Sequence, residues 1–382
     1  MLNDNDLSSM IAPMHRLTRD LYRAMGQADR EGVGGVTDSE ARYLVDTYYQ
    51  MQESRIRSNN RVKGLERDAK REENKPEPHD ALDFVQGQFA LLEKNLASIL
   101  GVYAETHPMG WFFERTVGIG PIISAGLLAH IDIKKAATAG ALWRFAGMEP
   151  TQRWESEATV RKLWEENEQA HLEDTIEAMC KVLGRRSDTV IRDATTNHAT
   201  GKTGKLTKDK AIKALCRIPY NRPFKTLLWK AGESFVKVKN REDAFYGREY
   251  AKRKAAEWQK NVYGGFADAA AQKLATTAIG KSTDAYAWYS GAVDAHKVRA
   301  LLREDNPIAL KDVLAEEGRG TPMLPPAHIH NRATRYVRKL FLSHLWECWR
   351  EQENLPIVKP FSIAIQGHAH YVAPPQKSPI KI

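Results

Sequence analysis

Residues 112–131 read FFERTVGIGPIISAGLLAHI, and the two glycines in this segment mark a turn between helices. Gly118 and Gly120 are separated by one residue, and Pro121 follows them directly. Glycine accepts a positive φ and allows another backbone to come close. Proline suits the first turn of a helix, where its missing N–H has no partner to lose. Apolar residues then recur at helical spacing, at Ala125, Leu128 and Ile131. The pattern predicts a helix–hairpin–helix.

Such a turn leaves the first N–H groups of the second helix unpaired and partly positive, which suits a phosphate oxygen. We expect backbone contacts from Gly118, Ile119, Gly120 and Ile122, extended by Lys134 and Lys135. The alternative is a turn that only connects packed helices. A dinucleotide-binding fingerprint is excluded, because Ile123 stands where the third glycine would fall and no buried strand precedes the turn.

The composition indicates a globular protein with a basic surface. The 382 residues suggest two or three domains, and 42% of them are hydrophobic. The net charge of +9 favours a polyanionic partner. Three widely spaced cysteines argue for a reducing compartment and against a disulfide framework. The sequence has no recognisable signal peptide and no apolar run of about 20 residues, so we expect a cytoplasmic protein without a membrane segment.

The positive charge is concentrated in residues 201–263, which hold 17 Lys and Arg against 6 Asp and Glu. A backbone-binding face needs such a concentration of charge. We therefore expect a second nucleic-acid contact here, from Lys225, Lys230, Lys237, Lys252, Arg253 and Lys254. Aromatic residues are interleaved with these cations. Most are expected in the core, with one or two free to stack on unpaired bases.

The periodicity predicts a mostly α fold with little β signal, beginning with a helical N-terminal region and continuing into a helical domain that contains the hairpin. The expected regions are 1–78, 79–153, 154–320 and 321–382. A helix over 80–101 should bury Leu82, Val85, Phe89, Leu92 and Leu96. A helix over 327–353 should bury Ala333, Val337, Leu340, Phe341, Leu345 and Cys348. A short strand is expected at Phe361–Ile365.

Together with the hairpin, three further segments resemble a known family. Leu142–Pro150 reads LWRFAGMEP, and the hairpin followed by this phrase resembles the C-terminal transposase domain of the insertion-sequence 110 family. Residues 219–229 (PYNRPFKTLLW) and 330–346 (HNRATRYVRKLFLSHLW) are similar to members of that family. The resemblance covers residues 110–155 well and 215–350 loosely.

The resemblance implies a helical, nucleic-acid-binding domain that supplies a serine nucleophile for strand exchange, in some members with a structured guide RNA. In that family a RuvC-like domain with acidic metal ligands precedes this domain. That half is not apparent here, because residues 1–100 contain no β-rich segment with spaced aspartates. No cofactor is evident, and Mg²⁺ would act only if an acidic site were supplied elsewhere.

Two serines are candidate nucleophiles, and each has a structural alternative. Ser156 follows Pro150 in the region where the family's serine is expected, but it also fits the N-cap of the next helix. Ser234 lies between Lys230 and Lys237, and its alternative is an ordinary serine inside a helix. The pairs His328–His330 and His368–His370 have no evident third ligand, so no metal site is expected.

These observations predict a transposase-like or recombinase-like enzyme of the serine type, encoded by a bacterial or phage mobile element. Its expected partners are DNA, a structured guide RNA and further copies of the chain. The alternatives left open are a non-catalytic DNA- or RNA-binding protein derived from the same scaffold, and a protein whose basic block docks an acidic protein.

Overall fold

The computed structural model describes residues 35–71, 80–149, 151–196, 200–293, 298, 321–358 and 371–377. Within these ranges the chain forms helices, turns and one isolated bridge between Thr196 and Thr203, without any strand. The expectation of a mostly α fold is therefore confirmed. Residues 1–34 of the expected helical N-terminal region, the strand expected at Phe361–Ile365 and the pair His368–His370 lie outside the described residues.

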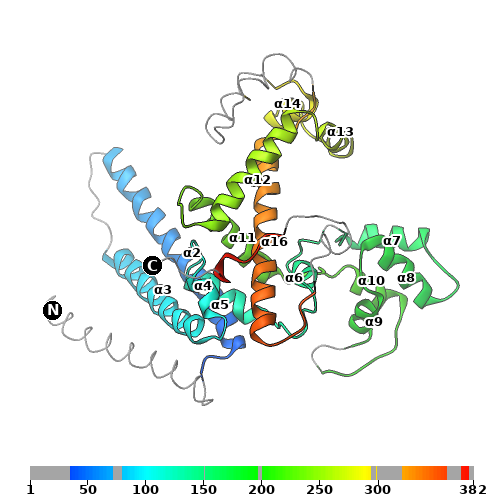
Figure 1. The fold of residues 1–382 in the computed structure, drawn as a ribbon, viewed down its shortest axis with the longest axis horizontal. Coiled ribbons are helices and arrows are strands. Elements are labelled where there is room, and N and C mark those ends of the chain that lie inside the picture. The colour runs from blue at the N-terminus through cyan, green and yellow to red at the C-terminus, as the bar shows by residue number, and fades with distance from the viewer. Residues whose placement is uncertain are drawn as a thin grey trace.

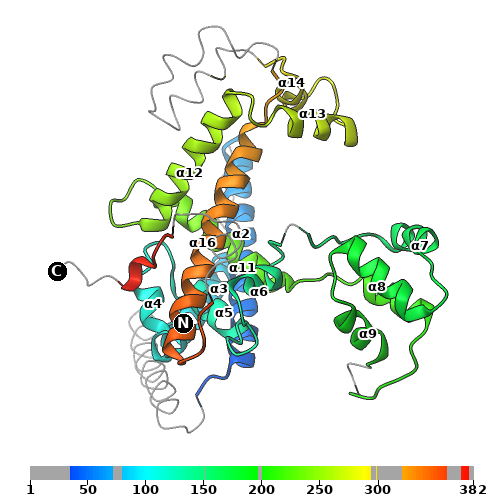
Figure 2. The same cartoon turned by 45° about the vertical axis from the view of Figure 1, so that its right-hand side comes forward.

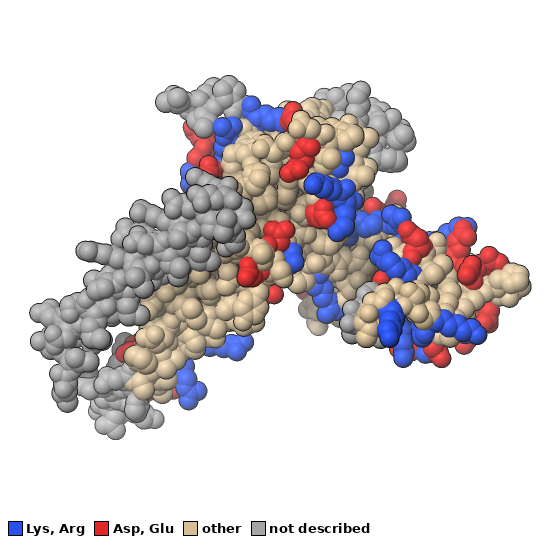
Figure 3. All heavy atoms as spheres, turned by 90° about the horizontal axis from the view of Figure 1, so that it is seen from below, with Lys and Arg blue, Asp and Glu red and all other residues tan. Residues whose placement is uncertain are grey.

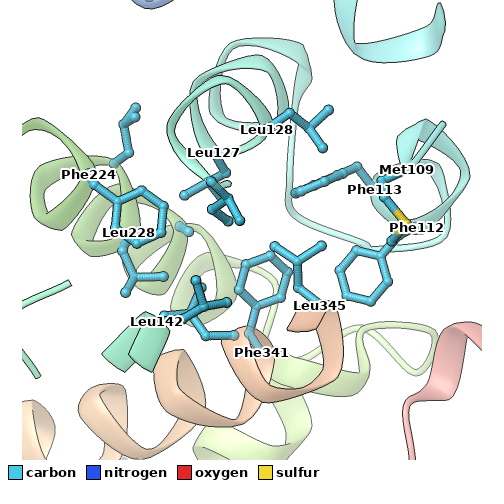
Figure 4. Packing of buried hydrophobic residues seen from close by; sticks show 14 of the residues in the cluster. Met109, Phe112, Phe113, Leu127, Leu128, Leu142, Phe224, Leu228, Phe341 and Leu345 are labelled. Carbon is cyan, nitrogen blue, oxygen red and sulfur yellow. The ribbon is translucent and has the colours of Figure 1, made fainter. Parts of the chain in front are cut away.

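The central body packs helices from both halves of the chain around one hydrophobic cluster (Figure 1). Its helices are α2 (Asp38–Arg71), α3 (Asp80–Thr106), α4 (Gly110–Glu114), α5 (Pro121–His130), α6 (Ala139–Phe145), α11 (Arg222–Lys237), α12 (Phe245–Val262) and α16 (Pro326–Gln352). Figure 4 shows Phe112 and Phe113 of α4, Leu127 of α5 and Phe224 of α11 converging on Phe341 of α16. The hairpin segment is thus part of the main core.

The long helix α16 forms the axis of this body. Ala333, Val337, Phe341, Leu345 and Cys348 are buried as the spacing predicts, and Leu340 is half-buried. These positions recur every three or four residues, which places them on one stripe of a helix. Three hydrogen bonds between a side chain and a backbone carbonyl join α16 to α6 and to Ala136. Trp143 donates to the Lys339 carbonyl at 3.2 Å, and Trp346 and Arg350 donate to the Ala136 carbonyl at 2.8 and 3.1 Å.

A second hydrophobic cluster lies where α12 ends and α16 begins, and it includes α13 (Ala267–Thr276) and α14 (Asp284–Ser290). Asn261 is fully buried and exchanges two hydrogen bonds of 2.9 Å with the backbone of Leu324. The buried Glu257 carboxylate pairs with both Arg253 and Arg332 at 2.6 Å. The contacts of Asn261 and Arg332 hold the end of α12 against the start of α16 and the residues before it.

The remaining helices form a separate lobe, which Figures 1 and 2 show projecting from the side of the body. They are α7 (Glu157–Glu166), α8 (Leu172–Leu183), α9 (Ser187–Thr195) and α10 (Lys208–Leu215), with their own hydrophobic cluster. Residues 154–180, which are rich in Asp and Glu, contribute to α7 and α8, and Trp164 of this segment is buried in the lobe. Residues 154–320, expected as one region, contribute helices to all three clusters.

The lobe is inserted between α6 and α11, and Arg185 ties its two connections together. The Arg185 guanidinium donates to the carbonyls of Leu215 at 2.9 Å, Arg217 at 2.6 Å and Arg153 at 3.4 Å. Trp154 of the entering connection also donates to the Cys216 carbonyl of the leaving one at 2.9 Å. Both connections thus run side by side, so the lobe interrupts the sequence without interrupting the central body.

Helices α2 and α3 form an antiparallel arm that extends from the body (Figure 1). Arg55 of α2 and Glu93 of α3 form an ion pair at 2.6 Å across it. The predicted core stripe of α3 is only partly right. Leu96 is buried, whereas Val85 and Leu92 are 41% and 42% exposed. Of the described helices, only α2 packs along this outer part of α3, which leaves a second apolar face of α3 exposed.

Candidate nucleic-acid interface

The turn between α4 and α5 has the local geometry that its glycines require. Gly118 adopts φ +97°, a conformation that side-chain-bearing residues rarely take. Gly120 is the N-cap of α5 with extended backbone, and Pro121 occupies the first position of the helix. A Cβ atom at Gly118 would lie 3.1 Å from Val238 Cγ2, whereas a Cβ atom at Gly120 would meet nothing within 4 Å. Gly118 is therefore needed by the fold, and Gly120 faces open space.

The amide groups of this turn are only partly as predicted. The N–H of Ile119 donates to the Thr116 carbonyl at 3.2 Å, so this group is not available to a ligand. Among the described residues, the N–H groups of Gly120, Ile122 and Ile123 have no acceptor, as is usual at the start of a helix. Gly120 and Pro121 are exposed, Ile123 is half-buried and Ile122 is buried, so of the three free amides only that of Gly120 belongs to an exposed residue.

The end of α11 packs against this turn and brings Ser234 to it. A Cβ atom at Gly118 would lie 3.4 Å from the carbonyl oxygen of Ser234. Ser234 is half-buried, and Lys237 in the last turn of the helix is exposed. The fold thus joins two segments that are more than 100 residues apart in the sequence, and it places a predicted serine and a predicted lysine close to the turn.

Ser156 lies elsewhere and serves as a helix cap. It is the N-cap of α7, where its hydroxyl accepts from the Thr159 N–H at 3.3 Å and lies 2.9 Å from the Thr159 hydroxyl. Figures 1 and 2 both show α7 in the lobe, apart from α4 and α5. The structural alternative weighed for Ser156 therefore describes its contacts.

The C-terminal segment 371–377 braces the turn from the other side. The buried Gln376 side chain donates to Thr116 Oγ1 at 2.8 Å and to the Tyr246 hydroxyl at 3.2 Å. Arg115 donates to the Gln376 carbonyl at 2.8 Å. The Tyr246 hydroxyl lies 2.9 Å from His344 Nδ1, and His344 Nε2 lies 2.9 Å from the Val372 carbonyl. Sequence analysis missed this network, because a lone glutamine in a proline-rich tail carries no local signal.

Lys134 and Lys135 lie beyond the opposite end of α5 from Gly120. Both are exposed, and Lys135 forms an ion pair with Asp132 at 2.8 Å. The ten residues of α5 separate them from the glycine turn by about 15 Å along the helix axis. They can extend the contact only to a ligand that runs along α5.

The basic block, residues 201–263, is divided between the lobe and the rest of the molecule. Its first part belongs to the lobe, and the part from α11 onward belongs to the central body and the second cluster. Lys225 Nζ lies 4.0 Å from the ring centroid of Tyr220, and Lys230 Nζ lies 3.6 Å from that of Tyr49. Partial burial lowers the pKa of Lys230. On the face shown in Figure 3, basic and acidic side chains alternate over the lobe.

The expected cluster of three cations on α12 is largely engaged within the protein. Lys252 pairs with Glu249 at 2.7 Å, and Arg253 pairs with the buried Glu257 at 2.6 Å. Lys254 also takes part in an interaction within the protein. Most of the interleaved aromatics are buried, as expected, while Trp229 is 51% exposed.

The histidines of α16 contact tyrosines. His330 Nδ1 lies 2.8 Å from the Tyr250 hydroxyl, and His328 Nδ1 lies 3.4 Å from the Tyr289 hydroxyl. In the described part of the chain, no group of three or more His, Cys, Asp or Glu side chains is placed to hold a metal ion. The helices of the same ranges include none with the length and apolar character needed to cross a bilayer.

The segments that carry the family resemblance pack against one another. The Asn221 N–H donates to the Phe145 carbonyl at 2.9 Å, and the rings of Phe145 and Phe224 lie 5.0 Å apart. Trp143 bonds to Lys339 of α16, as described above. No family model matches the chain, and no curated protein or solved structure matches it either. The family relationship therefore stays a prediction.

Proposed function

We propose that the protein binds the sugar–phosphate backbone of DNA through a helix–hairpin–helix formed by α4, the glycine turn and α5. The amides of Gly120, Ile122 and Ile123, which have no acceptor within the described residues and follow the exposed Gly120 at the start of α5, support this proposal. Backbone N–H groups at a helix start suit a phosphate oxygen, and the exposed Lys237 adds positive charge near the turn. Contacts of this kind position a duplex without reading its sequence.

We further propose that the bound DNA undergoes strand exchange of the transposase type, with Ser234 as the nucleophile in preference to Ser156. The Ser234 oxygen would bond to a backbone phosphorus while the bond from that phosphorus to a deoxyribose oxygen breaks, and the released oxygen takes up the serine proton as a free hydroxyl. The proximity of Ser234 to the turn supports this choice, since a nucleophile has to lie near the phosphates that the protein binds. The second candidate function is a DNA- or RNA-binding protein without chemistry. A guide RNA and a Mg²⁺ site supplied by another component belong to the enzymatic proposal.

A covalent protein–DNA adduct distinguishes the two functions. Labelled duplex, nicked and branched DNA would be incubated with the full chain and Mg²⁺, with and without co-purified RNA, and resolved on a denaturing gel. We expect an adduct that Ser234→Ala reduces at least about 100-fold and that Ser156→Ala retains. Loss in Ser156→Ala instead would assign the chemistry to the lobe. Binding without any adduct would support the non-catalytic function, and failure to bind any of these DNAs would refute both.

We also propose that two copies of the chain associate through the arm. Four large apolar side chains of α3 are exposed, namely Phe84 at 66%, Val85 at 41%, Leu91 at 37% and Leu92 at 42%. Their spacing places them on one helix face, away from α2. A two-helix arm with an uncovered apolar face can complete a four-helix bundle with a second copy of itself.

Light scattering after size-exclusion chromatography tests this association. We expect wild-type protein to run as a dimer and the double variant Leu91→Lys/Leu92→Lys to run near the monomer mass of 43.2 kDa. Ala90→Lys, at an exposed position on another face of α3, is the matched control and should remain dimeric. A wild-type mass of one chain at all concentrations would contradict the proposal.

A further inference from the structure

Three cations on successive turns of α16 lack the acidic partners that their neighbours have. Arg335, Arg338 and Lys339 are spaced i, i+3 and i+4, which places them side by side on the helix surface. Among the described residues, none of the three forms an ion pair within 4.0 Å. By contrast, Arg332, one turn earlier, contacts the Glu257 carboxylate at 2.6 Å. The group is thus an uncompensated cluster of like charge.

Maintaining this cluster has a free-energy cost within the protein alone. Burial lowers the pKa of both Arg338 and Lys339, and the positive charge of Arg335 lowers it further. The negative charge of Glu233 raises the pKa of Arg338, and that of Glu149 raises the pKa of Lys339, but neither carboxylate lies within ion-pair distance. Like charges held together are repulsive, and an anionic ligand would relieve that repulsion.

The Arg338 side chain is held in place. Its aliphatic stem lies over Gly232 of α11, where an added Cβ would come within 2.9 Å of Arg338 Cδ. Its Nε donates to the Thr334 carbonyl at 3.1 Å. No acceptor for its terminal Nη groups lies within the described part of the chain. A fixed guanidinium with free terminal donors matches the geometry of a phosphate group.

An aromatic ring lies next to one of these cations, and further rings follow on the neighbouring segment. Lys339 Nζ is 4.6 Å from the ring centroid of Trp143 in α6. The end of α6 contacts the start of α11, where Tyr220 lies under Lys225, and the half-exposed Trp229 follows one turn later. Cations beside partly open aromatic faces are typical of surfaces that bind unpaired nucleic acid, because bases stack on the rings while the cations contact phosphates.

This surface is distinct from the glycine turn. A Cβ atom at Gly232 of α11 would contact Arg338, whereas the α11 side of the contact to Gly118 is made by the Ser234 carbonyl and by Val238 Cγ2, at the end of the helix. Gly232 and Val238 are six residues apart, which corresponds to about 9 Å along an α-helix and to a different side of it.

We infer that Arg335, Arg338 and Lys339, together with Trp143 and Tyr220, form a second nucleic-acid site that takes an unpaired strand. The inference rests on the proposed function, in which the glycine turn holds a duplex. A strand-exchange protein needs to hold a separated strand apart from its duplex, and a site across α11 would do so. The shared chemistry of the ligand is a flexible polyphosphate with exposed bases, from either DNA or RNA.

The test measures the affinity of full-length protein for fluorescent dT20, U20 and a 20-bp duplex by anisotropy over a series of salt concentrations. The triple variant Arg335→Gln/Arg338→Gln/Lys339→Gln removes the cluster. Its matched control, Lys202→Gln/Lys205→Gln/Lys213→Gln, removes three exposed lysines from the lobe. We expect the cluster variant to bind unpaired strands about 30-fold more weakly than the control variant. The slope of log affinity against log salt should fall by about 2.

Duplex affinity separates this inference from the proposed function. We expect the cluster variant to keep duplex affinity within twofold of the control, and Gly120→Val to lose duplex affinity while it keeps that for dT20 or U20. Equal losses for duplex and strand in the cluster variant would mean one continuous surface and would overturn the second site. Unchanged strand affinity would also overturn it, whatever the duplex result.

Two further measurements test whether the site recognises phosphate groups and whether it prefers nucleic acid to an acidic protein. Arg338→Lys keeps the charge and removes the fork, and we expect it to fold as wild type and to lose about fivefold in strand affinity. Poly-glutamate is the competitor that represents an acidic protein. If poly-glutamate displaces dT20 when its carboxylates are as concentrated as the phosphates of dT20, the assignment to nucleic acid would be overturned. The ratio of dT20 to U20 affinity tells which source the site prefers, because only U20 carries the 2′-hydroxyl.

Discussion

At the glycine turn we expect Gly118→Ala to lower the free energy of unfolding by about 2 kcal/mol. We expect Gly120→Val to leave that free energy nearly unchanged and to weaken duplex binding about tenfold. At Gly118 the positive φ and the nearness of Val238 and of the Ser234 carbonyl leave no unstrained place for a methyl group. At Gly120 the backbone is extended and the space beside it is open, so a side chain fits but stands where a phosphate would approach.

Urea unfolding and duplex anisotropy on the same preparations measure the two effects separately. The contrast between the two glycines is the informative part, because valine at both positions would mix damage to the fold with damage to binding. If Gly120→Val binds duplex as wild type does, the turn is only a connection between packed helices. If Gly118→Ala is as stable as wild type, the close contact between Gly118 and α11 does not limit which residue the position accepts.

The second expected result is an acid-induced loss of stability centred on His344. This side chain is 2% exposed, and burial lowers its pKa to about 4. The Tyr246 hydroxyl donates to Nδ1 when Nε2 donates to the Val372 carbonyl, so the neutral ring satisfies both contacts. The unfolded state binds the proton near pH 6.5 and the folded state only near pH 4. Stability is therefore complete above pH 6.5 and falls as the pH drops towards 4, by about 3 kcal/mol.

Urea unfolding at several pH values between 7 and 4 checks this expectation. Other groups also titrate in this range, so the relevant quantity is the difference between wild type and His344→Gln. We expect the variant to be less stable at pH 7 and to lose about 3 kcal/mol less than wild type on acidification. His171→Gln, at an exposed position, should follow the wild-type curve. Parallel curves for wild type and His344→Gln would refute the assignment.

The two results are connected through the C-terminal segment. Protonation of His344 removes the acceptor for Tyr246, which in turn holds Gln376 against Thr116 in the glycine turn. Duplex affinity and stability should therefore weaken over the same pH interval. A change in stability without a change in affinity would mean that the segment supports the core but not the binding turn.

Local patterns were sufficient for much of this fold. The helix starts at Pro121 and Pro326, the positive φ at Gly118 and the buried stripe of α16 all follow from residue type and spacing over a few turns. Such features depend on backbone sterics and on helical periodicity, which act within a short segment and are therefore readable in it.

The sequence did not show which helix faces pack against one another. Val85 and Leu92 have the spacing of core residues but are exposed, and among the described helices none packs against that side of the outer arm. The basic block appears continuous in sequence, yet the fold divides it between the lobe and the body. Burial depends on neighbours from distant parts of the chain, and periodicity alone does not say whether a neighbour exists.

The amino-acid order alone was enough to set the helical character, the glycine turn and the excess of positive charge, since each is a local or additive property. The pairing of Ser234 with Gly118, the burial of Gln376 beside Thr116 and the isolation of the Arg335–Lys339 cluster arose only when α11, α16 and the C-terminal segment packed together. These contacts join residues far apart in the chain, so their free energies depend on a three-dimensional arrangement that no single segment encodes.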